Sequence, residues 1–377
     1  MLNEEQDPLI LLTTNSLDGG IGRNLINLSN SFLKLGCRVE LLTENCSNHY
    51  ENAINPSVNL STLKTTHVVF GIPQLAKHLF SNRPAVILTP VLRHTILAIR
   101  ARRLTGVPLR IFANIHNTYS IAYGGLPEKK LSSRIGKFQK YYPQCQGRIA
   151  VSRGVAEDFS NLTSIPISSI RTIYNPIDTE DILQQAAEPV NHSWFKEGEP
   201  PLILGLGRLE KQKNFHLLID AFDQLRGGGE IFCRLVIVGE GSLKNRLEKR
   251  ISRSPFKSDI CLYGYSDNPF SLMNNSSIMV LSSSWEGFGN VLVEAMAVGT
   301  PVLSTDCPHG PREILEDGRF GTLVPSGDPA VLARSILNNL HKPVPSEILK
   351  TAAAKFEAET IARSYLKTFE ISCPEDI

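Results

Sequence analysis

The chain has 377 residues, of which 42% are hydrophobic and 20% are charged. This composition is typical of a globular protein with room for two domains, and it excludes a disordered chain. The formal net charge is only +2, although the basic residues are unevenly distributed along the sequence.

Cysteine usage and the N-terminal residues bear on the compartment. The seven cysteines are odd in number, and none has the Cys-x-x-Cys or His-Cys spacing of a zinc site. We therefore expect reduced thiols and no structural zinc. The acidic N-terminal segment lacks the apolar region of a signal peptide, and no apolar run approaches the roughly 18 residues of a membrane span. We expect a cytoplasmic protein, either soluble or peripheral on the inner face of the cytoplasmic membrane.

Strands alternate with helices in the N-terminal half. A first strand is predicted at 8–13, followed by a Gly-rich turn at 18–22 and a helix over 24–35. Further strands are predicted at 39–43, 149–151 and 170–173. This alternation indicates an α/β fold with mainly parallel sheets.

Residues 93–148 form a strongly basic segment. It contains eleven basic residues and one acidic residue, Glu128, for a formal charge of +10. A solvated face is the usual explanation of such a run. Here apolar and aromatic residues are interleaved, which suits an anionic membrane surface or a phosphate-bearing ligand. No nucleic-acid-binding motif accompanies the segment, so we predict no nucleic-acid partner. The basic residues are Arg93, Arg100, Arg102, Arg103, Arg110, Lys129, Lys130, Arg134, Lys137, Lys140 and Arg148.

A second α/β series follows a linker-like stretch at 188–201. Its strands are predicted at 202–206, 234–238, 260–263 and 278–281, with a first helix over 214–225. We expect two Rossmann-like domains facing across a cleft, one over 1–190 and one over 191–345. A C-terminal helical segment over 346–377 is expected to pack back toward the N-terminal domain.

Two glutamates flank the start of a predicted helix over 290–298. Asn290 is its expected N-cap and Gly299 its C-terminal stop, which places Glu286 on the preceding loop and Glu294 in the second turn. A carboxylate in so apolar a helix is costly to bury without a partner or ligand. Gly287 and Gly289 allow close approach, and a helix N-terminus favours an anion. The alternative is that the glutamate before the helix merely serves its dipole.

A basic pair follows the strand at 202–206. Ligands of open parallel sheets bind at the carboxyl ends of the strands, so Arg208 and Lys213 are placed to reach one polyanion. Plain surface charge is the alternative. Gly205-Leu-Gly207 begins like a dinucleotide fingerprint, but Glu210 occupies its third glycine position, which disfavours a nicotinamide site. No Asp-x-Asp pair occurs in the chain, so we predict metal independence. No other cofactor is expected.

These motifs carry a family resemblance. Gly207-Arg208 with Lys213, Gly239-Glu-Gly241, and Glu286-Gly-Phe-Gly with Glu294 resemble the family-4 retaining glycosyltransferases (glycosyltransferase group 1) of the GT-B fold. The match is strong over 202–324 and loose in the N-terminal half. It implies transfer of a hexose or N-acetylhexosamine from a nucleotide-diphosphate sugar, expected to be UDP-linked. The acceptor is expected to be a glycan. The basic, aromatic-interleaved segment 93–148 suggests that this glycan is lipid-linked at a membrane surface, as in polysaccharide or lipopolysaccharide assembly.

The resemblance implies roles for individual residues. Arg208 and Lys213 would bind the donor diphosphate and stabilise its charge as the glycosidic bond breaks. Glu286 would bind donor-sugar hydroxyls, and His116 would lie beside the reacting sugar. Donor contacts would also come from Gly20 and Gly207, from Gly239, from Tyr265 near the base, from the backbone at Phe288, Gly289 and Asn290, and from Glu294 at the ribose. No carboxylate nucleophile is identifiable, so same-face attack with the β-phosphate as base is the expected retaining mechanism.

Two positions depart from the family pattern. The chain has Gly289-Asn290-Val291 where many relatives carry Gly-Leu-Pro, and His309 is an unexpected residue that could touch the donor sugar.

The alternative functions are an epimerase-type sugar-nucleotide enzyme and a non-catalytic nucleotide-sugar-binding protein. A soluble acceptor is the alternative within the same class.

Overall fold

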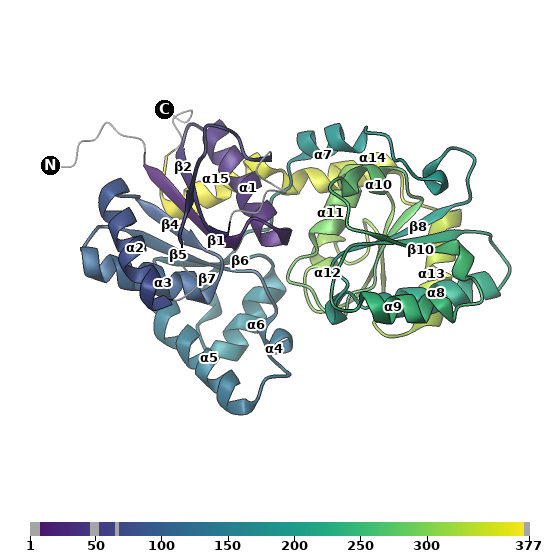
Figure 1. The fold of residues 1–377 in the computed structure, drawn as a ribbon, viewed down its shortest axis with the longest axis horizontal. Coiled ribbons are helices and arrows are strands. Elements are labelled where there is room, and N and C mark those ends of the chain that lie inside the picture. The colour runs from purple at the N-terminus through teal and green to yellow at the C-terminus, as the bar shows by residue number, and fades with distance from the viewer. Residues whose placement is uncertain (1–7, 46–52, 65–67, 373–377) are drawn as a thin grey trace. The chain divides into compact units, whose positions relative to one another are not determined.

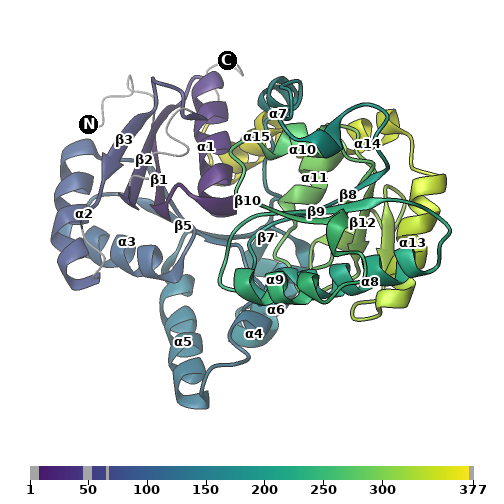
Figure 2. The same cartoon turned by 45° about the vertical axis from the view of Figure 1, so that its right-hand side comes forward.

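The computed structural model describes residues 8–45, 53–64 and 68–372 (Figures 1 and 2). The chain divides into two compact units: Met1–Pro176 with Phe356–Ile377, and Ile177–Lys355. The first division thus falls after Pro176 rather than at 190, and the second falls between the last two helices. Each unit contains one parallel sheet, and the predicted α/β fold is confirmed.

The sheet of the first unit has seven parallel strands in the order β3-β2-β1-β4-β5-β6-β7. The strand order reverses between β1 and β4, which is where open α/β sheets place their ligands. The strands are β1 (Leu9–Ser16), β2 (Arg38–Asn45), β3 (Asn59–Thr62), β4 (Val86–Thr89), β5 (Arg110–Ile115), β6 (Gly147–Ala150) and β7 (Ile170–Thr172).

Helices cover both faces of this sheet. Figures 1 and 2 show α1 and α15 side by side on one face and α2 beside α3 on the other. Right-handed crossovers on either side of the reversal require this arrangement. The helices of the unit are α1 (Gly19–Lys34), α2 (Val68–Asn82), α3 (Leu92–Thr105), α4 (Tyr119–Ala122), α5 (Glu128–Tyr141), α6 (Arg153–Thr163) and α15 (Ala358–Phe369).

The C-terminal helix α15 is part of the core of the first unit. Tyr365 and Phe369 are buried, and their rings pack against Phe32 of α1. The amide of Asn114 on β5 donates a hydrogen bond of 2.9 Å to the Tyr365 hydroxyl. Of the predicted segment 346–377, only the part from Phe356 onward belongs to this unit, whereas α14 (Ser346–Ala353) packs on α11 (Asn290–Ala297) of the second unit.

The sheet of the second unit has six parallel strands in the order β10-β9-β8-β11-β12-β13. The order reverses between β8 and β11. The strands are β8 (Leu202–Leu206), β9 (Arg234–Val238), β10 (Ile260–Gly264), β11 (Ile278–Leu281), β12 (Val302–Thr305) and β13 (Thr322–Val324). Four of these strands were predicted in nearly the observed positions, because each is a short apolar run bounded by polar or Gly-rich turns.

Helices also cover both faces of the second sheet. Helix α8 packs against α13 on one face, while α10, α11 and α14 gather on the other (Figure 1). The helices are α7 (Thr179–Ala186), α8 (Phe215–Gly227), α9 (Lys244–Ser252), α10 (Pro269–Asn274), α11 (Asn290–Ala297), α12 (Pro311–Ile314), α13 (Pro329–His341) and α14. Short 3-10 turns occur at Tyr142–Gln144, Ile167–Ser169, Ser193–Phe195, Lys211–Lys213, Lys257–Asp259 and Ala354–Phe356.

Two helix starts differ from the prediction. Helix α1 begins at Gly19, so the expected Gly-rich turn at 18–22 forms its first turn. A side chain at Gly22 would place its Cβ 2.0 Å from the carbonyl oxygen of Leu17, so this glycine is needed for close packing and not for a loop. Helix α11 has Gly289 as its N-cap in place of Asn290, because that position has a φ of 105°, which favours glycine.

Candidate donor-binding site

The candidate site lies at the carboxyl ends of β8 and β11, where the strand order of the second sheet reverses. These strands are adjacent, with Ile203 paired to Ile278. Loops that follow adjacent parallel strands emerge at the same edge of a sheet. This topology brings the loop that holds Arg208 and Lys213 next to the loop that holds Glu286, although Lys213 and Glu286 are 73 residues apart.

Glycines allow the loops after β8 and β9 to pack backbone against backbone. Gly207 has a φ of 150° and Gly239 a φ of 140°. A Cβ on Gly239 would lie 2.0 Å from the carbonyl oxygen of Gly207. A Cβ on Gly207 would lie 2.8 Å from Cε of Lys213. The absence of a side chain at Gly207 and Gly239 therefore allows the basic loop to adopt its position. This is a structural role, separate from any direct contact with a ligand.

Lys213 and Glu286 form a close ion pair. Nζ of Lys213 lies 2.6 Å from Oε1 of Glu286, and the side chains are only 13% and 8% exposed. The hydroxyl of Ser283 donates a second hydrogen bond of 2.6 Å to the same oxygen. Charge pairing and hydrogen bonding together compensate the cost of burying this carboxylate.

Gln212 connects the basic loop to the acidic loop, and the sequence reasoning did not single it out. Its amide nitrogen lies 3.0 Å from the carbonyl oxygen of Trp285 and 3.3 Å from Oε2 of Glu286. Its amide oxygen accepts a hydrogen bond of 3.3 Å from the guanidinium of Arg208. No sequence signal marks this residue beyond its place between the two basic residues, because its partners Trp285 and Glu286 come from a different βα unit.

The N-terminus of α11 completes the predicted donor-binding segment. Phe288 and Gly289 are buried, and Asn290 is the first helical residue. The first backbone N–H groups of a helix are not used within it, and the dipole favours an anion there. Glu294 lies in the second turn, as predicted, and is 6% exposed.

The segment that contains His309 runs beside Glu286. The backbone N–H of Glu286 donates to the carbonyl of Pro308 at 2.7 Å, and that of His309 donates to the carbonyl of Glu286 at 3.2 Å. A Cβ on Gly310 would lie 2.0 Å from the carbonyl oxygen of Phe288, so this glycine permits the contact. Burial raises the pKa of the neighbouring Cys307 thiol to about 12, with a smaller contribution from the charge of Glu286.

Tyr265 lies just beyond β10, at the edge of the second sheet, and is 42% exposed. Two residues earlier, Tyr263 packs its ring against that of His192, with a centroid distance of 5.9 Å. His192 belongs to the predicted linker 188–201, so part of that stretch is packed on the edge strand. The assignment of Tyr265 to a nucleotide base stays a prediction.

Two predicted site residues lie in the first unit. His116 directly follows β5, and its Nε2 is buried with no hydrogen-bond partner among the residues that the structure describes. Burial lowers the pKa of His116 to about 4, so the imidazole is neutral at pH 7. Gly20 lies exposed in the first turn of α1, after β1, rather than in a loop.

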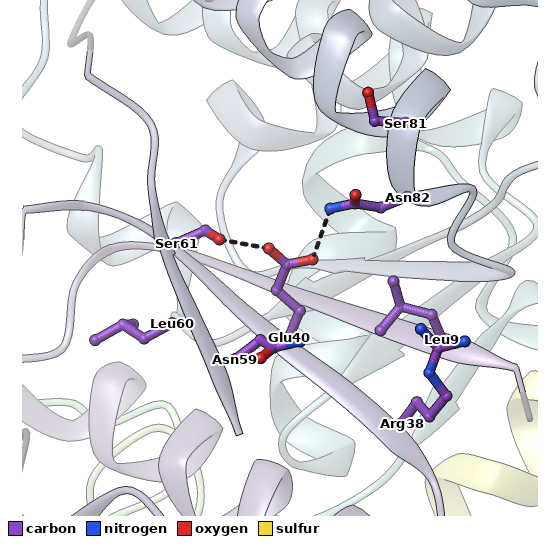
Figure 3. Close-up of a pocket in the computed structure, with 8 residues that line it drawn as sticks. All are labelled: Leu9, Arg38, Glu40, Asn59, Leu60, Ser61, Ser81 and Asn82. Atoms are coloured by element: carbon purple, nitrogen blue, oxygen red, sulfur yellow. Dashed lines mark hydrogen bonds between the residues drawn. The ribbon is translucent and has the colours of Figure 1, made fainter. Parts of the chain in front are cut away.

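A polar pocket of about 440 Å³ opens at the amino ends of the strands of the first sheet, opposite the carboxyl end of β5 that His116 follows (Figure 3). It lies where β1, β2 and β3 begin, whereas ligands of such sheets bind where strands end. Figure 3 shows Glu40 in its centre, accepting hydrogen bonds from Ser61 at 2.6 Å and Asn82 at 3.3 Å. Because its carboxylate is already satisfied within the fold, we do not assign a ligand to this pocket.

Residues 8–45, 53–64 and 68–372, which the structure describes, contain neither a cluster of metal-ligating side chains nor a membrane-spanning helix. Within these residues no group of three or more His, Cys, Asp or Glu side chains is arranged to hold a metal ion. The predicted metal independence stays a prediction. The same residues include no helix with the length and apolar character needed to span a bilayer. The five described cysteines, Cys37, Cys145, Cys233, Cys261 and Cys307, are free thiols.

Comparison with protein families gives a match for each half of the chain. Residues 189–356 match the family described as glycosyl transferases group 1. Residues 18–181 match glycosyltransferase family 4. The first match contains every predicted site residue of the second unit, and the second contains Gly20 and His116.

Curated relatives extend over most of the chain. A 31% identical protein from Campylobacter jejuni matches over 330 residues, or 85% of this chain and 86% of its own length. It is named N-acetylgalactosamine-N,N'-diacetylbacillosaminyl-diphospho-undecaprenol 4-alpha-N-acetylgalactosaminyltransferase. The lipopolysaccharide 1,6-galactosyltransferase of Escherichia coli is 26% identical over 280 residues, covering 72% of this chain and 70% of its own.

Solved structures share the whole architecture. Anabaena Alr3699/HepE in complex with UDP-glucose superposes with a TM-score of 0.78, covering 96% of this chain and 99% of that one at 18% identity. The lipopolysaccharide outer core galactosyltransferase WaaB superposes with a TM-score of 0.71 at 18% identity, covering 96% and 99% of the two chains. At these identities the likeness shows the fold, and it confirms the predicted GT-B architecture.

Proposed function

Because this chain belongs to the group 1, family 4 glycosyltransferases, we propose that it transfers a hexose or N-acetylhexosamine from a UDP-sugar to a lipid-linked glycan. Glycosyltransferase activity itself follows from membership. The donor, the sugar and the acceptor are parts of the proposal. They rest on the arrangement around Lys213 and Glu286 and on what the relatives are named for.

The observation that carries the donor proposal is the convergence of two cations and a carboxylate at one sheet edge. Arg208 and Lys213 supply a guanidinium fork and a point charge, a combination suited to a diphosphate. Glu286 lies 2.6 Å from Lys213, so a ligand bound through its phosphates there would place the attached sugar within reach of a carboxylate. UDP is the proposed nucleotide because a structure of the same fold contains UDP-glucose.

We propose a retaining, metal-independent reaction. The acceptor hydroxyl would attack the anomeric carbon on the face from which the diphosphate leaves, and the β-phosphate would take the hydroxyl proton. Arg208 and Lys213 would stabilise the charge that develops on the leaving diphosphate. They would do the work that a metal ion performs in enzymes with acidic motifs. His116, neutral at pH 7, would act as a hydrogen-bonding group rather than a cation.

The lipid-linked acceptor is proposed from the relatives and from the basic segment. The Campylobacter jejuni relative is named for a diphospho-undecaprenol-linked acceptor, and the Escherichia coli relative for lipopolysaccharide. Both names describe glycans carried on lipids. An enzyme that uses such an acceptor has to reach the surface of a membrane.

The structure divides the basic segment into two parts. Several arginines bind within the fold: Arg93 pairs with Glu44, Arg102 and Arg148 donate to backbone carbonyls, and Arg100 donates to Tyr141. In contrast, Lys129, Lys130 and Lys137 of α5 are exposed. We therefore propose that α5, and not the whole of 93–148, meets an anionic membrane surface.

The test of the donor is a calorimetric titration of UDP, GDP and ADP, followed by transfer assays with UDP-sugars in chelator. UDP should bind selectively, and Arg208→Ala should weaken it at least tenfold. Preference for GDP or ADP would change the donor but keep the reaction type. No binding of any nucleoside diphosphate would remove the proposed donor site, and donor binding without transfer or hydrolysis would favour a non-catalytic binder.

The membrane proposal has its own test, flotation with vesicles that do or do not contain anionic lipid. The triple change Lys129→Glu, Lys130→Glu, Lys137→Glu should abolish flotation with anionic vesicles, because each basic residue near the surface contributes about 1 kcal/mol. The matched control reverses three exposed cations of α9: Lys244→Glu, Arg246→Glu and Lys249→Glu. Equal loss in both triple variants, or no wild-type flotation, would contradict a role for α5.

A further inference from the structure

We propose that Gln212 is a positioning residue that holds Arg208 and Glu286 in the geometry needed for donor binding. The inference rests on the proposed function, because it concerns the same site. It adds a residue that neither the sequence motifs nor the comparisons assign. In this assignment Gln212 acts through its two neighbours, and it need not touch the donor itself.

The three hydrogen bonds of the Gln212 amide define its orientation. The nitrogen faces the carbonyl of Trp285 at 3.0 Å and the carboxylate of Glu286 at 3.3 Å, both of which are acceptors. The oxygen faces the guanidinium of Arg208 at 3.3 Å, which is a donor. A flipped amide would put donor against donor and acceptor against acceptor. The side chain thus faces a donor, the Arg208 guanidinium, at its oxygen and two acceptors at its nitrogen. An amide can form hydrogen bonds to both kinds of group, whereas a carboxylate or a hydrocarbon side chain cannot.

The backbone around Gln212 is held independently of its side chain. The N–H of Ser284 donates to the Gln212 carbonyl at 2.8 Å, and the hydroxyl of Ser282 donates to the Lys213 carbonyl at 2.8 Å. These bonds tie the basic loop to the loop after β11 without using the amide. A substitution of the Gln212 side chain should therefore leave the loop in place and change only what the amide orients.

The consequence for binding concerns the freedom of two side chains. Arg208 is exposed, and a free arginine side chain loses much rotamer entropy when it grips a ligand. A hydrogen bond to Gln212 restricts it before the ligand arrives, which is preorganisation. The same amide fixes one oxygen of Glu286, while Lys213 and Ser283 fix the other. Gln212 therefore links the proposed phosphate-binding side of the site to the proposed sugar-binding side.

Two near-isosteric variants separate these roles. Gln212→Met removes all three hydrogen bonds, and UDP should bind about threefold to tenfold more weakly because Arg208 is no longer preordered. Gln212→Glu places a carboxylate beside Glu286 and the Trp285 carbonyl while partly neutralising Arg208. It should weaken UDP further and lower kcat for transfer more than it changes KM. The matched controls are Gln224→Met and Gln224→Glu on the exposed face of α8, which should bind and turn over as wild type does.

The deciding experiment is a double-mutant cycle in UDP titration with wild type, Gln212→Met, Arg208→Ala and the double variant, each checked for an unchanged thermal midpoint. If Gln212 acts through Arg208, the Gln212→Met change should weaken UDP binding less than about twofold in a protein that already carries Arg208→Ala. A full additional loss in the double variant, or a Gln212→Met variant that binds UDP and transfers sugar like wild type, would overturn the inference and leave the proposed function intact. A wild-type protein that binds no nucleoside diphosphate would overturn both. Should Gln212→Met fail to fold, Gln212→Ala takes its place in the cycle.

Discussion

Lys213 and Glu286 are joined by an ion pair of 2.6 Å although they belong to different βα units of the second sheet. The pair has an implication for the proposed donor site. A lysine that is neutralised by a buried carboxylate is a weaker phosphate ligand than a free one, and a carboxylate held by lysine has fewer lone pairs for a sugar. A donor that offers both phosphate and sugar would use both groups at once.

A first prediction follows from this competition. Glu286→Gln should bind UDP as tightly as wild type or several-fold more tightly, because the Lys213 charge is then available to the phosphates. The same variant should lose the advantage that wild type shows for a UDP-sugar over UDP, and transfer should fall at least a hundredfold. Calorimetric titration of the two ligands into both proteins measures this difference. Weaker binding of UDP by Glu286→Gln would show that the carboxylate does not compete with the phosphates.

A second prediction concerns stability. Lys213→Met leaves Glu286 largely buried without its cation, and breaking such a pair costs about 3 kcal/mol. The double variant Lys213→Met, Glu286→Gln removes both charges and should regain most of that loss. Urea unfolding of wild type, both single variants and the double variant gives the coupling energy. Additive single effects would mean that the two residues do not stabilise each other in solution.

A third prediction addresses the glycine contact beneath the basic loop. Gly239→Ala places a Cβ at 2.0 Å from the Gly207 carbonyl oxygen, so one backbone has to move. This variant should lower the free energy of unfolding by about 2–4 kcal/mol. It should also weaken UDP binding, because the loop that carries Arg208 shifts. The control is Gly229→Ala, which has a φ of 72° but nothing within 4 Å of the added atom. That variant should lose only about 1 kcal/mol and keep its affinity. Similar losses in both would assign the effect to backbone strain alone.

A fourth prediction concerns pH and His116. Burial lowers its pKa from 6.5 to about 4, so between these values the unfolded chain binds a proton that the folded chain does not. Above pH 6.5 the imidazole is neutral in both states and does not change the free energy of unfolding with pH. As the pH falls from 6.5 toward 4, the free energy of unfolding decreases by no more than about 3 kcal/mol. His116→Gln should lack this part of the pH dependence, whereas His341→Gln, on an exposed position of α13, should retain it. Parallel stability curves for wild type and His116→Gln over this range would contradict a buried neutral imidazole.

Much of the architecture could be predicted from local sequence. The runs at Leu202–Leu206 and Ile278–Leu281 are apolar, short and bounded by turns, and they form strands as expected. The helix after Glu286 ends before Gly299, which has a φ of 82° as a helix stop requires. The same motifs identified the family. Hydrophobic pattern, turn residues and motif spacing all act over short distances, so they can be recognised in the sequence itself.

Local signals failed where close packing sets the conformation. The glycines at 19–22 were expected to form a turn, but they form the first turn of α1, where a Cβ at Gly22 would lie 2.0 Å from the carbonyl oxygen of Leu17. Asn290 is a good N-cap by residue type, yet Gly289 takes the position with positive φ. The charge of residues 93–148 indicated one basic surface, whereas Arg93, Arg102 and Arg148 bind within the fold. Composition does not show which charges face inward.

The sequence by itself thus determined the fold class, the family and the chemical types gathered in the motifs, because these depend on residues near one another in the chain. Only the tertiary structure decided which of those residues meet. The reversal of strand order between β8 and β11 sets Lys213 against Glu286 and places Gln212 between Arg208 and the acidic loop. Such contacts depend on the pairing of β8 with β11, which are separated in the chain by two other strands, β9 and β10, and no local pattern encodes that pairing.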